Sequence, residues 1–177
     1  TLNGGEQNIM GGGTGLVSTM NSGSQVISSS GTGTVDTLNG GTQTVAGGGN
    51  GTVSTMLGGT QVVSRSGKGT VNALNGGTQI VSVGGTSLDT VLNSGGEQLI
   101  LNGGTALDTE LNGGIMQMSS GGIVSGMTMT GGSMVLENID GGSFNINGTL
   151  TANNAVIDMT DSSVTRAGTP AYESLTI

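Results

Sequence analysis

Polar and apolar side chains along this chain follow a pattern that repeats every eighteen residues. The segment TLNGGTQTV at 37–45 returns with three substitutions as TMLGGTQVV at 55–63. Within each copy apolar and polar residues alternate, which is typical of short β-strands with one buried side. Glycine pairs separate the two strands of a copy, because glycine supplies the positive φ angles and the close backbone approach that corners demand.

One glutamine marks the repeat along the chain. Its spacings are 18 residues four times and then 19 twice, and it recurs as Gln7, Gln25, Gln43, Gln61, Gln79, Gln98 and Gln117. An apolar residue follows two positions after each glutamine until Ser119 interrupts the series. Since the glutamine and that apolar residue share parity, we expect both to point inward, with amides one coil apart hydrogen-bonded along the molecule.

The period predicts the architecture. A unit of two short strands cannot bury its own apolar side, but units stacked about 4.8 Å apart bury it against their neighbours. We therefore predict an all-β fold, a parallel β-solenoid with 18–19 residues per coil. Nine or ten coils would form a rod of about 45 Å. A meander of antiparallel hairpins is the alternative, although hairpins do not require one residue to return at a constant offset.

The repeat is regular over residues 1–125 and degrades over 126–177 without disappearing. In the second part glycine pairs and alternating strands still recur, and methionine becomes the common apolar residue, which suits a less uniform interior. We expect one continuous domain with regular coils followed by degenerate ones. Because Thr1 enters in the middle of a repeat, the chain is expected to be a fragment of something longer.

Composition excludes several classes of protein. Of 177 residues 38 are glycine, one is proline, one is tyrosine and one is phenylalanine, so an ordinary globular core is not expected. The formal charge is −8 with three basic residues, which disfavours nucleic acid and anionic membranes as partners. Cysteine and histidine are both absent, so thiolate and imidazole metal sites are excluded. We expect no cofactor and no metal.

Candidate catalytic groups are sparse. Carbohydrate-active β-helix enzymes need clustered carboxylates, and here the acids are scattered along the chain. Asp89 and Asp108 are placed to lie on adjacent coils, either sharing a cation or remaining a solvated pair. The Gly-x-Gly strings arise from the repeat itself, with no helix to receive a phosphate. We do not expect an enzyme.

The outward-facing residues carry the functional hypothesis. One predicted face is flat, polar and acidic, and its candidate self-association residues are Thr34, Asp36, Thr52, Ser54, Thr70 and Asn72, with Ser87 and Asp89 continuing it. We expect this face to lack apolar groups, and Arg65 and Lys68 to lie at a nearby corner where they meet Asp36 of a second copy. The other face has aliphatic residues flanked by hydroxyl groups, and its successive pairs are Thr42/Thr44, Thr60/Val62, Thr78/Ile80 and Glu97/Leu99.

The repeat resembles a known family. TLNGGTQTVAGGG at 37–49 is similar to the short repeat of AIDA-type self-associating autotransporter adhesins of Gram-negative bacteria, over about residues 1–125. The ending RAGTPAYESLTI at 166–177 resembles the region where such passenger domains enter a C-terminal folding-assisting segment. The first coils depart from the family in using 18 rather than 19 residues, and the tail departs in being rich in methionine.

The resemblance implies a right-handed β-helix on the bacterial cell surface, tethered to the outer membrane by a separate barrel or released. It implies a virulence-associated adhesin whose partners are copies of itself on neighbouring cells, leading to aggregation and biofilm, with the host-cell surface as a further partner. Some members are glycoproteins with heptose on Ser or Thr, so a glycosyltransferase is another implied partner. No direct membrane contact by this part of the chain is expected. The alternatives are a carbohydrate-active β-helix enzyme and a passive surface stalk.

Overall fold

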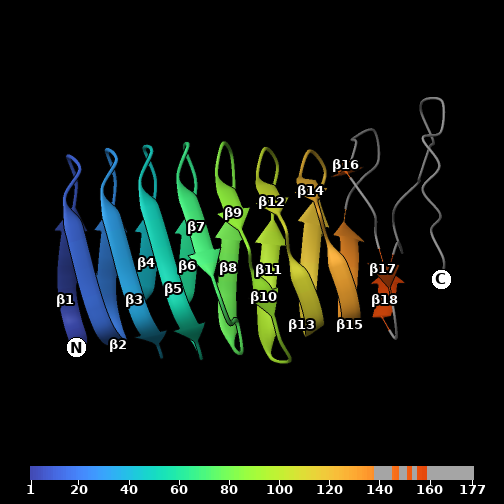
Figure 1. Ribbon diagram of the computed structural model, residues 1–177, viewed down its shortest axis with the longest axis horizontal. Helices are drawn as coiled ribbons and strands as arrows, with labels where there is room; N and C mark the ends of the chain where they lie inside the picture. Colours follow the sequence, from blue (N-terminus) through green and yellow to red (C-terminus); the bar gives the residue numbers. More distant parts are fainter. Residues whose placement is uncertain (138–144, 148–150, 153–154, 159–177) are drawn as a thin grey trace.

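The computed structural model describes residues 1–137, 145–147, 151–152 and 155–158, with side chains described as far as residue 136. The described chain contains strands, turns and no helix, and every pair of strands is parallel. It winds through about eight turns of roughly 18 residues (Figure 1), which confirms the predicted parallel β-solenoid and excludes the hairpin meander. The expectation of nine or ten coils was made for all 177 residues, part of which lies outside the described ranges.

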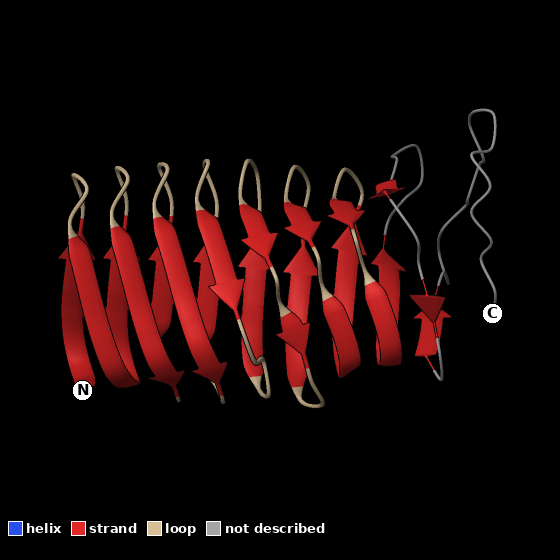
Figure 2. Ribbon diagram, viewed as in Figure 1, coloured by secondary structure: helices blue, strands red, loops and turns tan. Residues whose placement is uncertain are grey.

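Each coil has a front strand and a back strand, joined at the upper edge by a tight turn and at the lower edge by a corner (Figure 2). The front strands are β3 (Thr32–Leu38), β5 (Asn50–Met56), β7 (Lys68–Val71), β9 (Thr86–Leu88), β10 (Val91–Leu92), β12 (Thr105–Leu107), β14 (Ile123–Ser125), β16 (Asn145–Asn147) and β17 (Thr151–Ala152). The back strands are β4 (Thr42–Val45), β6 (Thr60–Val63), β8 (Gly77–Val81), β11 (Gly96–Ile100) and β18 (Ala155–Asp158). Four long strands bend through the lower corner, namely β1 (Leu2–Ile9), β2 (Thr14–Ile27), β13 (Glu110–Ser119) and β15 (Thr128–Glu137).

The upper edge is a column of β-turns, each closed by a hydrogen bond from the fourth residue to the first. The N···O distances are 2.7–3.1 Å in the described turns, which span 10–13, 28–31, 46–49, 64–67, 82–85, 101–104 and 119–122. In the earlier turns both central residues have positive φ, as at Arg65 (48°) and Ser66 (66°). From the turn at 82–85 onward only the second central residue does, as at Gly84 (72°). The turn type therefore changes halfway along the solenoid.

The interior is built from columns of identical or similar residues, one per coil. Leu38 of β3 pairs with Met20 and Met56 in the flanking coils, and all three are fully buried. Val45 lies between Ile27 and Val63 in the same way. Because each apolar side chain packs on its counterparts one coil away, a coil buries its apolar face only when its neighbours are present.

Glutamine forms a hydrogen-bonded column through this interior, as predicted. Each Nε2 donates to the Oε1 of the glutamine one coil earlier at 2.6–2.7 Å, and the members are Gln7, Gln25, Gln43, Gln61, Gln79 and Gln98. All but Gln7 are fully buried. Second N–H groups reach backbone carbonyls, for example from Gln61 to the oxygen of Thr70 at 3.4 Å. No buried side-chain polar atom in the described part lacks a hydrogen-bond partner.

Glycine lines the front strands opposite this ladder, because a side chain would occupy the same space. A Cβ added at Gly51 would lie 2.9 Å from the Oε1 of Gln43 and would also overlap the Val45 side chain. The same inward position is occupied in later coils by Ser87, Ala106 and then Val124, each paired with its predecessor. Residue size at this position therefore rises toward the end of the ladder.

The prediction that Gln117 continues the column was wrong. Met116 pairs with Gln98, so Met116 is the buried residue and Gln117 faces outward beside Leu99. The apolar column is likewise not interrupted at Ser119, since Met118 pairs with Ile100 and continues the column. The physical reason is that one extra residue lies between Leu92 and Gln98, which are six positions apart, whereas Leu74 and Gln79 are five apart. The step from Gln79 to Gln98 is therefore 19 residues, and the next step, from Gln98 to Met116, is again 18.

Methionine fills the coils that follow. The buried methionines of this part are Met116, Met118, Met127, Met129 and Met134. β13 and β15 pair from Glu110 and Thr128 as far as Ser119 and Glu137, so the parallel winding continues past residue 125. The prediction of a final coil leading to a folding-assisting segment concerns 138–177, most of which lies outside the described residues. The division into regular and degenerate coils stays a prediction.

Candidate functional site: the outward faces of the coils

The candidate self-association residues lie together on the front face. Thr34 of β3 pairs with Thr52 of β5, and Thr52 pairs with Thr70 of β7, which makes one column across three coils. All three side chains are half-buried. Their spacing is the strand separation of about 4.8 Å.

A second column runs beside the first, two residues further along each front strand. It consists of Asp36, Ser54 and Asn72, of which Asp36 and Asn72 are exposed and Ser54 is half-buried. These residues face outward because their strands alternate, with Val35 and Val53 fully buried between the outward positions. The front-face cluster therefore exists as a small grid of hydroxyl, amide and carboxylate groups, and we call its six residues the polar grid.

The expected continuation of the polar grid through Ser87 and Asp89 was wrong. Ser87 is fully buried, pairs with Gly69 and accepts a hydrogen bond from Gln98 at 3.1 Å, while Leu88 takes the outward place next to Thr70. Asp89 adopts a positive φ of 47°, and the buried residue after it is Thr90. Ser87 keeps the inward place of Gly69, and the kink after it buries Thr90 where the previous coil has the exposed Asn72.

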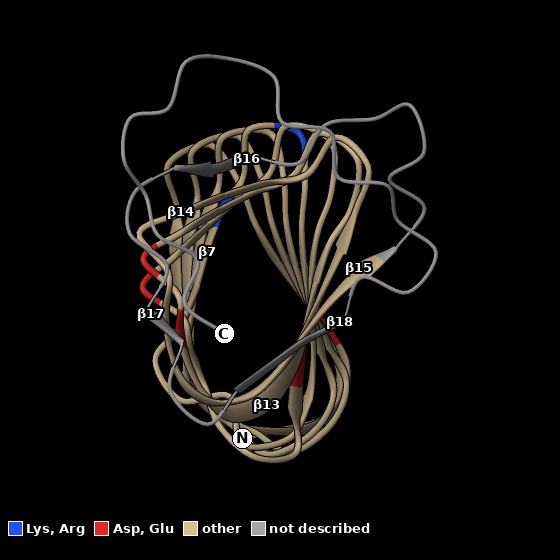
Figure 3. Ribbon diagram, turned by 90° about the vertical axis from the view of Figure 1, so that its right-hand side faces the viewer, with Lys and Arg blue, Asp and Glu red and all other residues tan. Residues whose placement is uncertain are grey.

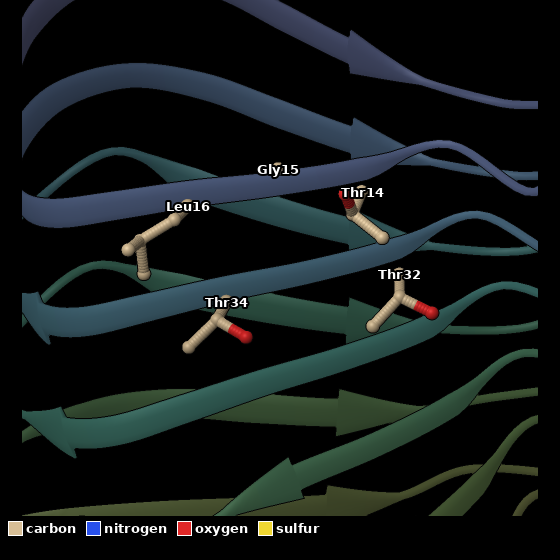
Figure 4. A pocket seen from close by; sticks show the side chains of 5 residues that line it. All are labelled: Thr14, Gly15, Leu16, Thr32 and Thr34. Carbon is tan, nitrogen blue, oxygen red and sulfur yellow. The ribbon is translucent and has the colours of Figure 1, made fainter.

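The expectation of a face without apolar groups was also wrong at both ends of the grid. Leu16 of β2 pairs with Thr34 and is 63% exposed, and Leu88 bounds the grid at its other end. An open hollow at the Leu16 end is lined by Thr14, Gly15, Leu16, Thr32 and Thr34 (Figure 4). These side chains offer hydroxyl and methyl groups and no ionisable group.

The two described basic residues lie at the turn edge of the front face. Arg65 is a central residue of the turn 64–67, and Lys68 begins β7. Both are exposed. In the view along the rod the basic positions fall at the upper edge, and the acidic positions lie on the two sides and below (Figure 3). The polar grid therefore has Lys68 and Asp36 on opposite margins of the same face.

The back face presents the second predicted series. Val62 pairs with Thr44 and Ile80, and Leu99 pairs with Ile80, so these outward residues form one half-buried column. Beside it Thr42, Thr60 and Thr78 are also in register and half-buried. The back face thus offers threonines in the same geometry as the front face, next to an aliphatic column, and Glu97 continues the threonine column beside Thr78, which donates to it at 3.3 Å.

Asp89 and Asp108 lie on adjacent coils, as their neighbours Leu88 and Leu107 pair directly. Both are exposed and both have positive φ. No group of three or more potential metal-ligating His, Cys, Asp or Glu residues occurs in the part of the chain that the structure describes. Within that part, too, no helix is long and apolar enough to span a membrane.

A row of asparagines on the lower corner was missed by the sequence reasoning. Asn21 donates to Asn3 at 2.7 Å and Asn39 donates to Asn21 at 2.8 Å, both on the exposed side of the corner. The row is visible in the sequence as asparagine one position after the buried Leu or Met of each coil, interrupted at Leu57.

Comparisons with known proteins give a likeness of fold. The sequence matches no known protein family profile and no curated protein. The fold is similar to the crystal structure of a hyper-glycosylated fragment of TibA, with the glycosylation catalysed by TibC. The two chains are 24% identical, the match covers 88% of this chain and 72% of the TibA fragment, and the TM-score is 0.46.

Proposed function

We propose that this chain is part of a bacterial cell-surface adhesin that acts by self-association through side-by-side contacts of the solenoid. The observation that supports the proposal best is the polar grid, which repeats similar outward groups on three consecutive coils at constant spacing. A copy laid alongside makes the same small contact on each coil. The resemblance of the repeat to AIDA-type adhesins points to the same function.

The energetics favour many weak contacts over one strong one. A hydrogen bond between hydroxyl or amide groups in water contributes about 1 kcal/mol net. Once the first contact of a pair of rods has formed, the others are effectively intramolecular, so several coils together give a specific interaction. Two-fold symmetry makes such an interface self-complementary between molecules on two cells. Display of many copies per cell multiplies the effect.

Electrostatics give a first test of the contact. The chain carries a net charge of −8, so two copies repel each other over long range. A direct contact between Lys68 of one copy and Asp36 of another opposes that repulsion locally. If this contact dominates, cells that display the segment settle more slowly in high salt, and if overall repulsion dominates they settle faster. We expect slower settling.

The decisive experiment compares matched double variants on the two faces. Thr52→Glu with Thr70→Glu places charges in the polar grid, and Thr42→Glu with Thr60→Glu does the same in the equivalent half-buried column of the back face. We expect cells that display the front-face double variant not to settle, and cells that display the back-face double variant to settle at the wild-type rate. Circular dichroism verifies that both fold.

The opposite result would assign the contact to the back face and its aliphatic residues Val62, Ile80 and Leu99. Loss of settling in neither variant would favour the passive stalk, with adhesion residing elsewhere. Release of sugar from a polysaccharide would favour the carbohydrate-active enzyme.

The outward serines and threonines are accessible acceptors for a glycosyltransferase, and the mass of the protein from its native host tests that partner. Adherence of purified protein to host cells tests the host-cell surface as a further partner.

A further inference from the structure

The exposed asparagine row has a direction, and Leu57 divides it into two unlike ends. In the hydrogen-bonded asparagine pairs of this row the Nδ2 of the later coil donates to the Oδ1 of the earlier coil, as from Asn39 to Asn21 and from Asn93 to Asn75. Leu57 occupies the same corner position between Asn39 and Asn75 and is 54% exposed. It can neither accept from Asn75 nor donate to Asn39.

The two asparagines beside Leu57 therefore differ in the state of their amides. Asn39 uses its Nδ2 as a donor to Asn21 at 2.8 Å, and no described side chain donates to its Oδ1. Asn75 is the reverse: its Oδ1 accepts from Asn93 at 2.7 Å, and its Nδ2 has no acceptor among the described residues. Both are exposed, and both precede a glycine, Gly40 or Gly76.

We propose that Asn75 is a site of spontaneous deamidation and that it reacts faster than Asn39. The backbone nitrogen of Gly76 attacks the side-chain Cγ of Asn75, the N–Cγ bond forms, and the Cγ–Nδ2 bond breaks with loss of ammonia. The amide proton of Gly76 leaves to the solvent and the departing nitrogen takes a proton from it. Water then opens the cyclic imide at either carbonyl, which yields aspartate or isoaspartate at position 75.

The hydrogen bond from Asn93 supplies the difference between the two sites. An N–H aimed at a carbonyl oxygen stabilises the negative charge that develops there when a nucleophile adds to the carbon. Asn75 has this donor and a leaving nitrogen that is not held by an acceptor, and Asn39 has neither advantage. Both reside in Asn-Gly pairs, in which the small residue leaves room for the attack, and asparagine is a thermolabile residue in general.

The attacking nitrogens are held in a similar way at the two sites. The Gly76 nitrogen donates to the Met56 oxygen at 3.1 Å, and the Gly40 nitrogen donates to the Met20 oxygen at 3.3 Å. The longer hydrogen bond leaves the Gly40 nitrogen slightly freer to attack, so this difference by itself favours the reaction at Asn39. A faster reaction at Asn75 is then attributable to the side-chain amide and not to the freedom of the backbone.

The modification has a structural consequence. Each event adds one negative charge to a chain whose net charge is already −8. An isoaspartate also lengthens the backbone by one carbon at the corner where Gly76 bonds to Met56, which loosens the winding of that coil. If the chain is displayed outside a cell, as proposed above, the fraction of copies deamidated at position 75 rises with the time since synthesis.

The test incubates the intact folded chain in mildly alkaline buffer at physiological temperature, and measures aspartate and isoaspartate at positions 75 and 39 by peptide mapping over time. We expect deamidation at Asn75 to be about fivefold faster than at Asn39, the ratio that one hydrogen bond of ordinary strength gives. The same chain unfolded in denaturant should lose this difference, because the ladder is then absent. Equal rates in the folded chain, or a faster reaction at Asn39, would overturn the proposal.

Two variants sharpen the comparison. Leu57→Asn should complete the row, which gives Asn75 an acceptor for its Nδ2 and gives Asn39 a donor to its Oδ1, so Asn75 should slow while Asn39 accelerates. Asn93→Leu removes the donor to Asn75 and should slow that site alone. Circular dichroism and the unfolded-state rates identify a variant that reacts only because it is misfolded. Rates at both sites unchanged by Leu57→Asn would rule the mechanism out.

Discussion

The coils that contain the glutamine ladder and the coils after Gly114 follow the same backbone path but fill it differently. In the earlier coils Gln43 and Gln61 lie opposite inward glycines, while in the later coils Met116 and Met134 occupy the glutamine position. A ladder of amides requires every member, since each glutamine is both donor and acceptor for its neighbours. Methionine needs only contact, and its flexible side chain fills gaps of irregular shape.

The boundary between the two regions is made by hydroxyl groups. Thr90 and Thr109 donate to the Oε1 atoms of Gln79 and Gln98 at 3.1 and 3.4 Å. The Gln98 oxygen would otherwise face Met116, which has no donor to offer. A polar interior can therefore end inside an apolar one without an unsatisfied amide, provided that a hydroxyl closes the ladder.

The largest expected effect comes from removing the space that the ladder needs. Gly51→Val places a branched side chain against Gln43 and Val45, and we expect a loss of about 3 kcal/mol or more through overpacking. Valine is the native residue at the same inward position in the later coils, at Val124. Chemical denaturation measures the loss, with the outward Thr52→Val as the control of similar shape. A stable Gly51→Val protein would show that the two regions differ less than their packing indicates.

Breaking the ladder in its middle should cost somewhat less. Gln61→Leu leaves the Oε1 of Gln43 without a donor and the Nε2 of Gln79 without an acceptor, so we expect a loss of about 1–3 kcal/mol. The outward substitution Thr60→Leu, on the adjacent residue, controls for the change in composition. An unchanged denaturation midpoint for Gln61→Leu would contradict the dependence of these coils on continuous amide bonding.

Adding an amide to the methionine region should be tolerated only at the boundary. Met116→Gln extends the ladder, because its Nε2 can donate to Gln98, whereas Met134→Gln buries an amide with methionine as its neighbour. We expect Met134→Gln to be less stable than Met116→Gln by about 1–2 kcal/mol, the penalty for an unpaired buried amide. Melting curves of the two variants side by side measure the difference, and equal melting temperatures would count against the ladder account.

The smallest expected effect concerns the turns. Ser66 has a φ of 66°, a conformation that costs an ordinary residue about 1 kcal/mol, so Ser66→Gly should stabilise the chain by up to that amount. Val83 is the first central residue of the next turn and does not have a positive φ, so Val83→Gly should destabilise it slightly through lost backbone entropy. Stabilisation by both variants would mean that the two turn types differ less than their φ angles indicate.

The sequence by itself determined the winding, the inward glutamines as far as Gln98, and the two outward faces of the coils before Ser87. A constant offset of eighteen residues permits only parallel stacking, and parity within a strand then decides which side chains are buried. Thr34, Thr52 and Thr70 could be placed in one column for this reason, and the structure brings them together.

Only the tertiary structure decided what happens where the repeat changes length. One extra residue is absorbed at the corner between Leu92 and Gln98, so the next inward residue is Met116 and not Gln117. The kink at Asp89 leaves this residue exposed at the place of the buried Val71 and buries Thr90 at the place of the exposed Asn72, which the spacing of charged residues did not reveal. A one-residue shift exchanges the two faces of a strand, and where the backbone absorbs it depends on the packing of the neighbouring coils rather than on local composition.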